Sequence, residues 1–146
     1  MPIDLPDPSL FHVAVDIEVR WGDLDALAHV NNATYFTYFE SARIAWFAHM
    51  APGQPVSLQS VGPIVARASC DFLKPIGFPA VVRVATRARK VGTTSLEMDY
   101  LVTDRESAEV HALGAAVLVM FDYRTALKVP IPDELRRRIQ ALEGVL

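Results

Sequence analysis

The chain has 146 residues, of which 51% are apolar and 21% are charged, so it is long enough for one domain with a full hydrophobic core. This composition excludes intrinsic disorder for the chain as a whole. The net charge of −3 provides no basic surface for nucleic acid or for an anionic membrane, so we expect neither as a partner. The single cysteine, Cys70, cannot form an internal disulfide, which suits the reducing cytoplasm.

The start of the chain is acidic and rich in proline, which predicts an extended N-terminal segment over residues 1–10. A signal peptide would instead begin with basic residues followed by an apolar stretch. The longest apolar run, residues 112–121, is far too short to span a bilayer. We therefore expect a cytoplasmic protein.

The first regular elements are a strand and a long helix. Residues 12–20 alternate between apolar and polar side chains, which predicts a half-buried strand. After a polar turn, residues 33–49 contain no Gly or Pro and carry apolar side chains around nearly the whole circumference. This pattern predicts a long helix that is buried on all sides. A loop with two prolines and a glycine follows, over residues 51–59.

The second half of the chain is rich in strand signals. Four strands are predicted, at residues 63–74, 79–91, 94–103 and 108–123, and a final helix is expected over about 132–142. The breaks between the strands are short, which favours antiparallel hairpins over crossover connections.

This order of elements predicts an α+β fold in one domain, residues 1–146. A buried helix needs a surface that wraps it, and a curved five-stranded antiparallel sheet supplies one. The last strand is apolar on both faces, so we expect one face to meet the helix and the other a partner subunit of a homo-oligomer.

The turn before the long helix, residues 21–32, carries two carboxylates, a histidine and two asparagines. A helix N-terminus offers unpaired backbone N–H groups and a partial positive charge. A carboxylate beside it can attack an acyl group or activate water while the N–H groups stabilise the oxyanion. These residues alone predict a hydrolase that acts on an acyl group.

Together these segments resemble the hotdog-fold thioesterases, specifically the 4-hydroxybenzoyl-CoA thioesterase-like family of acyl-CoA hydrolases. The resemblance covers nearly the entire domain. It rests on Arg20-Trp21-Gly22-Asp23-Leu24-Asp25, on His29-Val30-Asn31-Asn32, on Tyr35, Tyr38, Glu40 and Arg43, and more weakly on Phe72-Leu73-Lys74-Pro75-Ile76. Many members of the family have glycine before this histidine, whereas this chain has Ala28.

The resemblance implies a hotdog fold and an enzyme that hydrolyses a thioester to a free acid and CoA. Asp25 would be the catalytic residue, either as nucleophile or as general base, and the backbone around Asn31 and Asn32 would polarise the thioester carbonyl. CoA enters only as part of the acyl-CoA substrate, and no metal or other cofactor is expected. The active sites of a homodimer or homotetramer would lie between subunits.

The other polar residues of the turn have ordinary structural roles as well. Asp23 is expected to cap the turn or to tune Asp25. His29 is a second candidate acid or base, although a histidine at such a place more often forms a hydrogen bond or packs. One of the two asparagines is expected to be the helix N-cap, which would also fix the oxyanion donors.

Within the helix, Glu40 and Arg43 are three residues apart and are expected to form an ion pair. Glu40 remains a reserve candidate for the catalytic carboxylate. Tyr35 is expected in the core, where it could also line the acyl pocket. Cys70 alternates with apolar residues and is expected to be an inert buried thiol.

The remaining substrate contacts are predicted on the strands. Gly62 and Pro63 form either a turn that enters the second strand or a backbone contact to the substrate of a neighbouring subunit. For the phosphates of CoA the sequence offers six basic residues, and arginine forks suit phosphate oxygens: Arg67, Lys74, Arg87, Arg89, Lys90 and Arg124. Residues 87–90 also fit an ordinary solvated strand edge.

Two other functions share this fold. An enoyl-CoA hydratase or dehydratase would pair an acid with a histidine, as Asp25 and His29 could. A non-catalytic module would bind an acyl-CoA or an acyl carrier without turnover.

Overall fold

The computed structural model describes residues 3–52, 61–144 and 146. Its helices are α1 (Asn32–Met50) and α2 (Asp133–Glu143), with two short 3-10 helices, η1 (Pro8–Leu10) and η2 (Trp21–Asp23). Its strands are β1 (Val13–Glu18), β2 (Val61–Phe72), β3 (Val81–Val91), β4 (Ser95–Asp104), β5 (Val110–Asp122) and β6 (Leu127–Lys128). No helix within the described ranges is long and apolar enough to cross a membrane.

All predicted strands and both helices are present, and the differences are small. The two-residue β6 was not predicted, and η1 interrupts the N-terminal segment that was expected to be extended. Asp7 caps η1 by accepting a hydrogen bond from the backbone N–H of Ser9. From residue 53 onward, the loop expected over residues 51–59 lies outside the described part of the chain.

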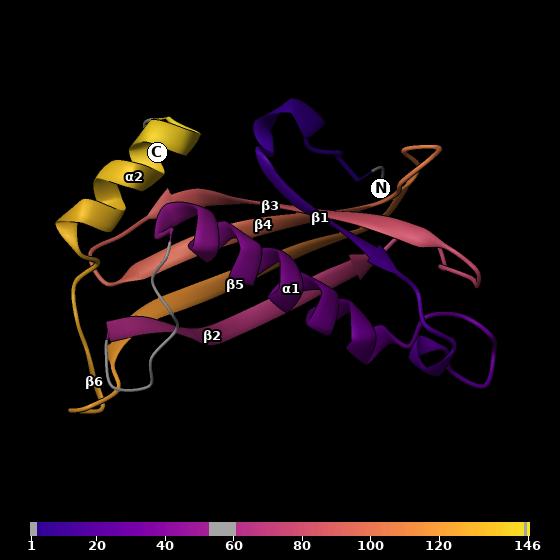
Figure 1. Ribbon diagram of the computed structural model, residues 1–146, viewed down its shortest axis with the longest axis horizontal. Coiled ribbons are helices and arrows are strands. Elements are labelled where there is room, and N and C mark those ends of the chain that lie inside the picture. The colour runs from indigo at the N-terminus through magenta and orange to yellow at the C-terminus, as the bar shows by residue number, and fades with distance from the viewer. Residues whose placement is uncertain (1–2, 53–60, 145) are drawn as a thin grey trace.

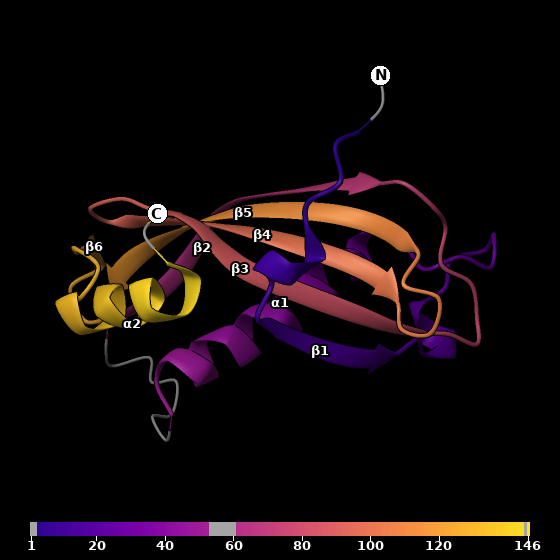
Figure 2. The same ribbon diagram turned by 90° about the horizontal axis from the view of Figure 1, so that it is seen from above.

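The strands form one antiparallel sheet in the order β1-β3-β4-β5-β2, with β6 paired to β5. The sheet curves, and α1 lies against one of its faces (Figures 1 and 2). The predicted wrapping of a five-stranded antiparallel sheet around a long helix is therefore confirmed.

One predicted hairpin is wrong, because β2 does not pair with β3. β2 pairs with β5 at one edge of the sheet, whereas β3 lies between β1 and β4. The connection 73–80 must therefore cross the end of the sheet over three strand spacings, about 14 Å. A segment of this length extends to about 26 Å, so it makes the crossing easily.

The buried face of α1 forms the centre of the core. Its buried residues recur at helical spacing and face the sheet: Tyr35, Tyr38, Phe39, Ala42, Trp46 and Met50. The expectation of a helix buried on all sides is wrong for the single chain, since Phe36 and Ile44 are exposed. The reason is geometric: one sheet covers one side of a helix and leaves the opposite side open.

The tightest approach between α1 and the sheet is at Gly114 of β5. The ring of Phe39 lies directly on this glycine, and a Cβ atom at Gly114 would be 2.4 Å from Phe39 Cζ. The same ring stacks on Tyr100 of β4, with ring centroids 4.6 Å apart. Glycine is therefore the residue that lets the helix pack this closely.

The edge strand β2 is largely uncovered, and most of its residues are exposed. A groove of about 240 Å³ separates it from α1, with Glu40 and Arg43 in its lining. Arg43 Nη1 donates a hydrogen bond to the Tyr100 hydroxyl at 3.0 Å, and no ion pair joins Arg43 to Glu40 in the described residues. The predicted pair is wrong because a partner on a distant strand competes for the guanidinium.

Candidate active site

The turn that carries Asp25 is closed at its base by backbone pairing. Leu24 and Val30 form an isolated antiparallel bridge, and the Asp25 N–H donates to the His29 carbonyl at 2.8 Å. The Ala28 N–H donates to the Asp25 carbonyl at 3.0 Å. Ala28 has φ of 61°, in the left-handed region that glycine adopts at little cost.

The Asp25 carboxylate is held by one of its two oxygens. Oδ1 accepts hydrogen bonds from the backbone N–H of Leu27 at 2.8 Å and of His29 at 3.4 Å. Oδ2 has no hydrogen bond to any described residue, and the side chain is exposed. One oxygen therefore orients the carboxylate, and the other remains available to a substrate or a water molecule.

The N-terminus of α1 begins next to this turn. Asn31 is the N-cap, and its Oδ1 accepts a hydrogen bond from the Ala33 N–H at 3.0 Å. The backbone N–H of Asn32, the first helical residue, has no acceptor among the described residues. The expectation that one asparagine caps the helix is confirmed for Asn31, and it leaves the N–H of Asn32 available for a ligand.

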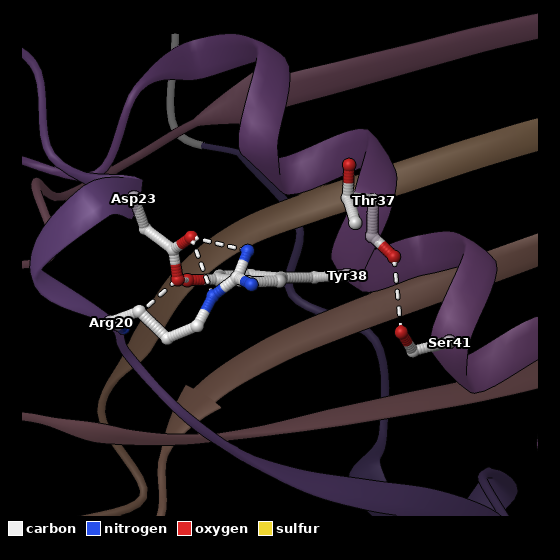
Figure 3. Close-up of polar contacts among 5 residues, drawn as sticks. All are labelled: Arg20, Asp23, Thr37, Tyr38 and Ser41. Atoms are coloured by element: carbon white, nitrogen blue, oxygen red, sulfur yellow. Dashed lines mark hydrogen bonds and ion pairs between the residues drawn. The ribbon is translucent and has the colours of Figure 1, made fainter.

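Asp23 has the structural role expected for it. Its carboxylate accepts hydrogen bonds from the backbone and side chain of Arg20 and, at 2.8 Å, from the Tyr38 hydroxyl (Figure 3). Burial alone would raise the pKa of Asp23, but these hydrogen bonds outweigh it and hold the pKa below its ordinary value. Burial, followed by the hydrogen bond to Asp23, raises the pKa of Tyr38.

A cavity of about 430 Å³ lies in front of Asp25. One wall contains every residue predicted to be catalytic, together with Tyr35: Asp25, His29, Asn31 and Asn32. The other wall comes from the end of β2 and the start of the crossing connection: Phe72, Leu73, Lys74 and Pro75. Of this second wall only Lys74 was predicted, as a contact to the CoA phosphates, although all four residues belong to the weaker stretch of the family resemblance.

The side chains of Tyr35 and His29 complete the first wall. The buried Tyr35 ring packs edge to face on Phe72, with centroids 4.9 Å apart, and burial raises the pKa of its phenol. His29 is exposed, and its hydrogen bonds to Asp25 are made by its backbone N–H and carbonyl.

The other predicted substrate contacts lie elsewhere in the single chain. Gly62 and Pro63 are inside β2, paired with β5, and not in a turn before it. They stand at the opposite end of that strand from the cavity. Arg67 and Arg89 border a separate hollow of about 230 Å³ on the sheet, and Arg89 forms ion pairs with Glu97 and Asp99.

Lys90 follows Arg89 on β3 and is exposed. Glu40 lies about 13 Å along the helix axis from Asn31 and lines the α1–β2 groove, not the cavity at Asp25. In the described part of the chain, no three His, Cys, Asp or Glu side chains gather in a way that could hold a metal ion.

A curved antiparallel sheet around one long helix, with a carboxylate at the N-terminus of that helix, is the architecture of a hotdog-fold thioesterase. The family model of the Thioesterase-like superfamily matches residues 19–139. The chain belongs to this superfamily, and it is a thioester hydrolase.

Three relatives illustrate the family. A thioesterase from Thermus thermophilus, whose crystal structure contains coenzyme A and Zn, is 39% identical, with a TM-score of 0.82 over 93% of this chain and 97% of that one. The uncharacterized protein YsmA of Bacillus subtilis is 30% identical over 81% of this chain and 78% of its own length. The long-chain acyl-CoA thioesterase FadM of Escherichia coli is 21% identical over 86% of this chain and 96% of its own.

Proposed function

We propose that this thioester hydrolase cleaves acyl-CoA to a free acid and CoA, with Asp25 as its catalytic carboxylate. The observation that carries the proposal is the position of Asp25 Oδ2, unpaired within the described residues, in the same cavity as the N-terminus of α1. Relatives that bind coenzyme A or act on acyl-CoA support this class of substrate.

In the proposed reaction, the thioester carbonyl oxygen faces the N–H of Asn32. That N–H and the positive end of the helix stabilise the negative charge that develops on the oxygen. Asp25 Oδ2 either attacks the carbonyl carbon to form a mixed anhydride, which water then hydrolyses, or removes a proton from the attacking water. The C–S bond breaks, and the departing CoA thiolate takes up a proton, for which His29, in the lining of the same cavity, is the candidate donor.

In this proposal most of the predicted CoA contacts come from a second subunit, although Lys74 lines the cavity of the same chain. Arg67, Arg89 and Lys90 are far from Asp25 along the strands, and Gly62 and Pro63 lie at the other end of β2. We therefore place the active site of the proposed enzyme between two copies of the chain, with Tyr35 in the acyl pocket of one copy and the basic residues of the other near the CoA phosphates.

The surface that best suits a second copy is the edge strand β2. It is long, mostly exposed, and flanked by the open groove beside α1. An exposed strand edge is a template for pairing with another chain. This location differs from the outer face of the last strand, where the sequence predicted the contact. Light scattering after size exclusion should report a dimer or tetramer, and a monomer at micromolar concentration would contradict the assembly.

The reaction is tested by free-thiol release from a panel of aliphatic and aromatic acyl-CoAs. Asp25→Asn keeps the side-chain oxygen that orders the turn and removes the charge, so turnover should fall at least about a hundredfold. Asp133→Asn is a matched control, because Asp133 is an exposed aspartate at the start of the other helix. Full activity of Asp25→Asn would refute the role of Asp25 and favour Glu40.

Oxygen-18 labelling and trapping together separate the two roles of Asp25. In a single turnover in labelled water, label in the Asp25 carboxylate identifies a mixed anhydride that water opens at the Asp25 carbon. Label only in the acid product fits either a general base or an anhydride opened at the acyl carbon, and only the anhydride would leave Asp25 acylated in rapidly quenched enzyme. We also propose that no metal ion takes part, so EDTA should leave the rate unchanged.

The rival functions give different results in the same assay. A hydratase would convert crotonyl-CoA to the hydroxyacyl-CoA without thiol release. A binding module would hydrolyse no thioester and would still bind acyl-CoA after Asp25→Asn. If no acyl-CoA reacts, thioesters of carrier proteins are the next substrates to test.

A further inference from the structure

We infer that Tyr38 is a positioning residue for the proposed hydrolysis: by holding Asp23, it sets the placement of the Asp25 carboxylate relative to the N-terminus of α1. This inference rests on the proposed role of Asp25. It assigns a function to a buried hydroxyl that takes no part in the chemical steps above.

The hydroxyl of Tyr38 contacts the segment that leads into the turn of Asp25. It donates to Asp23 Oδ2 at 2.8 Å, and both side chains are only 3% exposed. The carboxylate accepts three further hydrogen bonds, all from Arg20. Arg20 belongs to the same short segment and its side chain is 78% exposed, so its contacts move with the turn and cannot fix the turn on the helix.

Tyr38 can do so because it comes from α1 itself. It follows the N-cap Asn31 by two helical turns, about 10 Å, on the same face of the helix. Helical side chains lean toward the N-terminus, which directs the Tyr38 hydroxyl back to Asp23. The element that offers the oxyanion donor therefore also holds the turn that carries the carboxylate.

Backbone pairing provides the rest of the attachment. The Asn31 N–H donates to the Asp23 carbonyl and the Asp25 N–H donates to the His29 carbonyl, both at 2.8 Å, so a short backbone ladder joins the two sides of the turn. This ladder ends at the N-cap Asn31, whereas the Tyr38 hydroxyl holds the Asp23 side chain from two turns further along α1. Without the hydroxyl, the ladder can tilt as a unit against the helix, and the Asp25 carboxylate then moves relative to the N–H of Asn32.

The first experiment measures kcat and KM of Tyr38→Phe on the best acyl-CoA of the panel. Loss of the hydroxyl should lower kcat about tenfold, because misplacement of a reacting group by about 1 Å can cost up to a hundredfold. KM should change less than about twofold, since no substrate contact is removed.

Tyr100→Phe is the matched control. Tyr100 is another buried tyrosine, 1% exposed, whose hydroxyl accepts a hydrogen bond from Arg43, away from the turn. Both variants should lose thermal stability, but only Tyr38→Phe should lose kcat. In nitrogen–proton correlation spectra, the amides of Leu27 and Asn32 should shift in Tyr38→Phe and not in Tyr100→Phe.

A double-mutant cycle tests the route of the effect. In the Asp25→Asn background, Tyr38→Phe should cause no further loss of the residual rate, since no carboxylate remains to be positioned. Asp23→Asn, at the other end of the hydrogen bond, should lower kcat similarly, and adding Tyr38→Phe to it should cost less than the product of the two single effects.

Unchanged kcat in a Tyr38→Phe protein that is folded would overturn the inference and leave Tyr38 a purely structural residue. The inference would also be overturned if Tyr38→Phe lowered the rate by the same factor in the Asp25→Asn background as in the wild type. Full activity of Asp25→Asn alone is a different outcome, because it refutes the proposed catalytic residue whatever Tyr38 does.

Discussion

Gly114→Ala tests the close packing of α1 on the sheet. The new methyl group would lie 2.4 Å from Cζ and 2.5 Å from Cε2 of Phe39, so the ring must retreat about 1 Å to reach ordinary contact. The ring is stacked on Tyr100 and cannot move without disturbing the core.

The expected loss of stability follows from two opposing contributions. Overpacking of this kind costs about 1–3 kcal/mol. Replacing glycine restricts the unfolded chain and returns about 0.4–1 kcal/mol. These ranges leave a net loss of about 0–2.6 kcal/mol. Because the Phe39 ring is stacked on Tyr100 and cannot retreat freely, we expect the upper part, about 1–2.5 kcal/mol, which for a chain of this size lowers Tm by about 5 °C.

Urea unfolding at a fixed protein concentration measures this loss. Gly62→Ala is the matched control: it is also a strand glycine, but its Cβ would meet only Tyr123 Cε2, at 3.4 Å, an ordinary contact. Phe39→Leu combined with Gly114→Ala should cost less than the sum of the two single changes, because the smaller side chain makes room. Stability of Gly114→Ala equal to that of the wild type would refute the close-packing argument.

Three further predictions concern the site and its surroundings. Ala28→Gly should leave the free energy of unfolding unchanged or raise it by up to about 1 kcal/mol. Glycine removes the strain of the left-handed conformation at Ala28, and this gain offsets the entropy cost of glycine in the unfolded chain. A clear fall in the urea midpoint would contradict this. The pKa of Asp23 is raised by burial but lowered more by its hydrogen bonds, so its stabilising contribution is fully present above the ordinary value of 3.8 and is lost as pH falls through the lowered pKa. The stability difference between wild type and Asp23→Asn should therefore be constant above about pH 4 and shrink as the pH falls further, through the lowered pKa. Burial, with the nearby charge of Asp71, raises the pKa of Cys70 to about 12. Ellman's reagent should therefore label Cys70 far more slowly than a free thiol at about pH 8. Rapid stoichiometric labelling would contradict this, because it would show that the thiol is accessible.

Local patterns in the sequence predicted the elements well because their causes are local. The alternation in residues 12–20 reflects a strand with one face on the core, and β1 lies there. The polar turn followed by a stretch without Gly or Pro marks the start of α1, and Asn31 caps it. The turn of Asp25 could be predicted for the same reason, since its residues are contiguous.

The pairing of the strands depends on contacts that no local pattern records. The short break after β2 predicted a hairpin with β3, yet the apolar β5 offers a longer partner far along the chain. The same error hid most of the second wall of the cavity: the sequence named Lys74 as a CoA contact, but not that Phe72 and Pro75 line the cavity of Asp25 with it. Likewise, the spacing of Glu40 and Arg43 predicted an ion pair, and Tyr100, distant in sequence, receives the guanidinium hydrogen bond instead.

The crossing connection, residues 73–80, has a consequence for how such enzymes diversify. It supplies one wall of the cavity, and its backbone is fastened outside the strand ladders, by Leu73 and Lys74 to the His111 carbonyl and by the Ile76 carbonyl to Val30. Substitutions or short insertions in this segment can reshape the cavity while the register of the sheet and the turn of Asp25 stay as they are. If the cavity binds the acyl group, as proposed, selectivity for that group can change independently of fold and chemistry, which makes this segment the natural place to graft a new substrate preference.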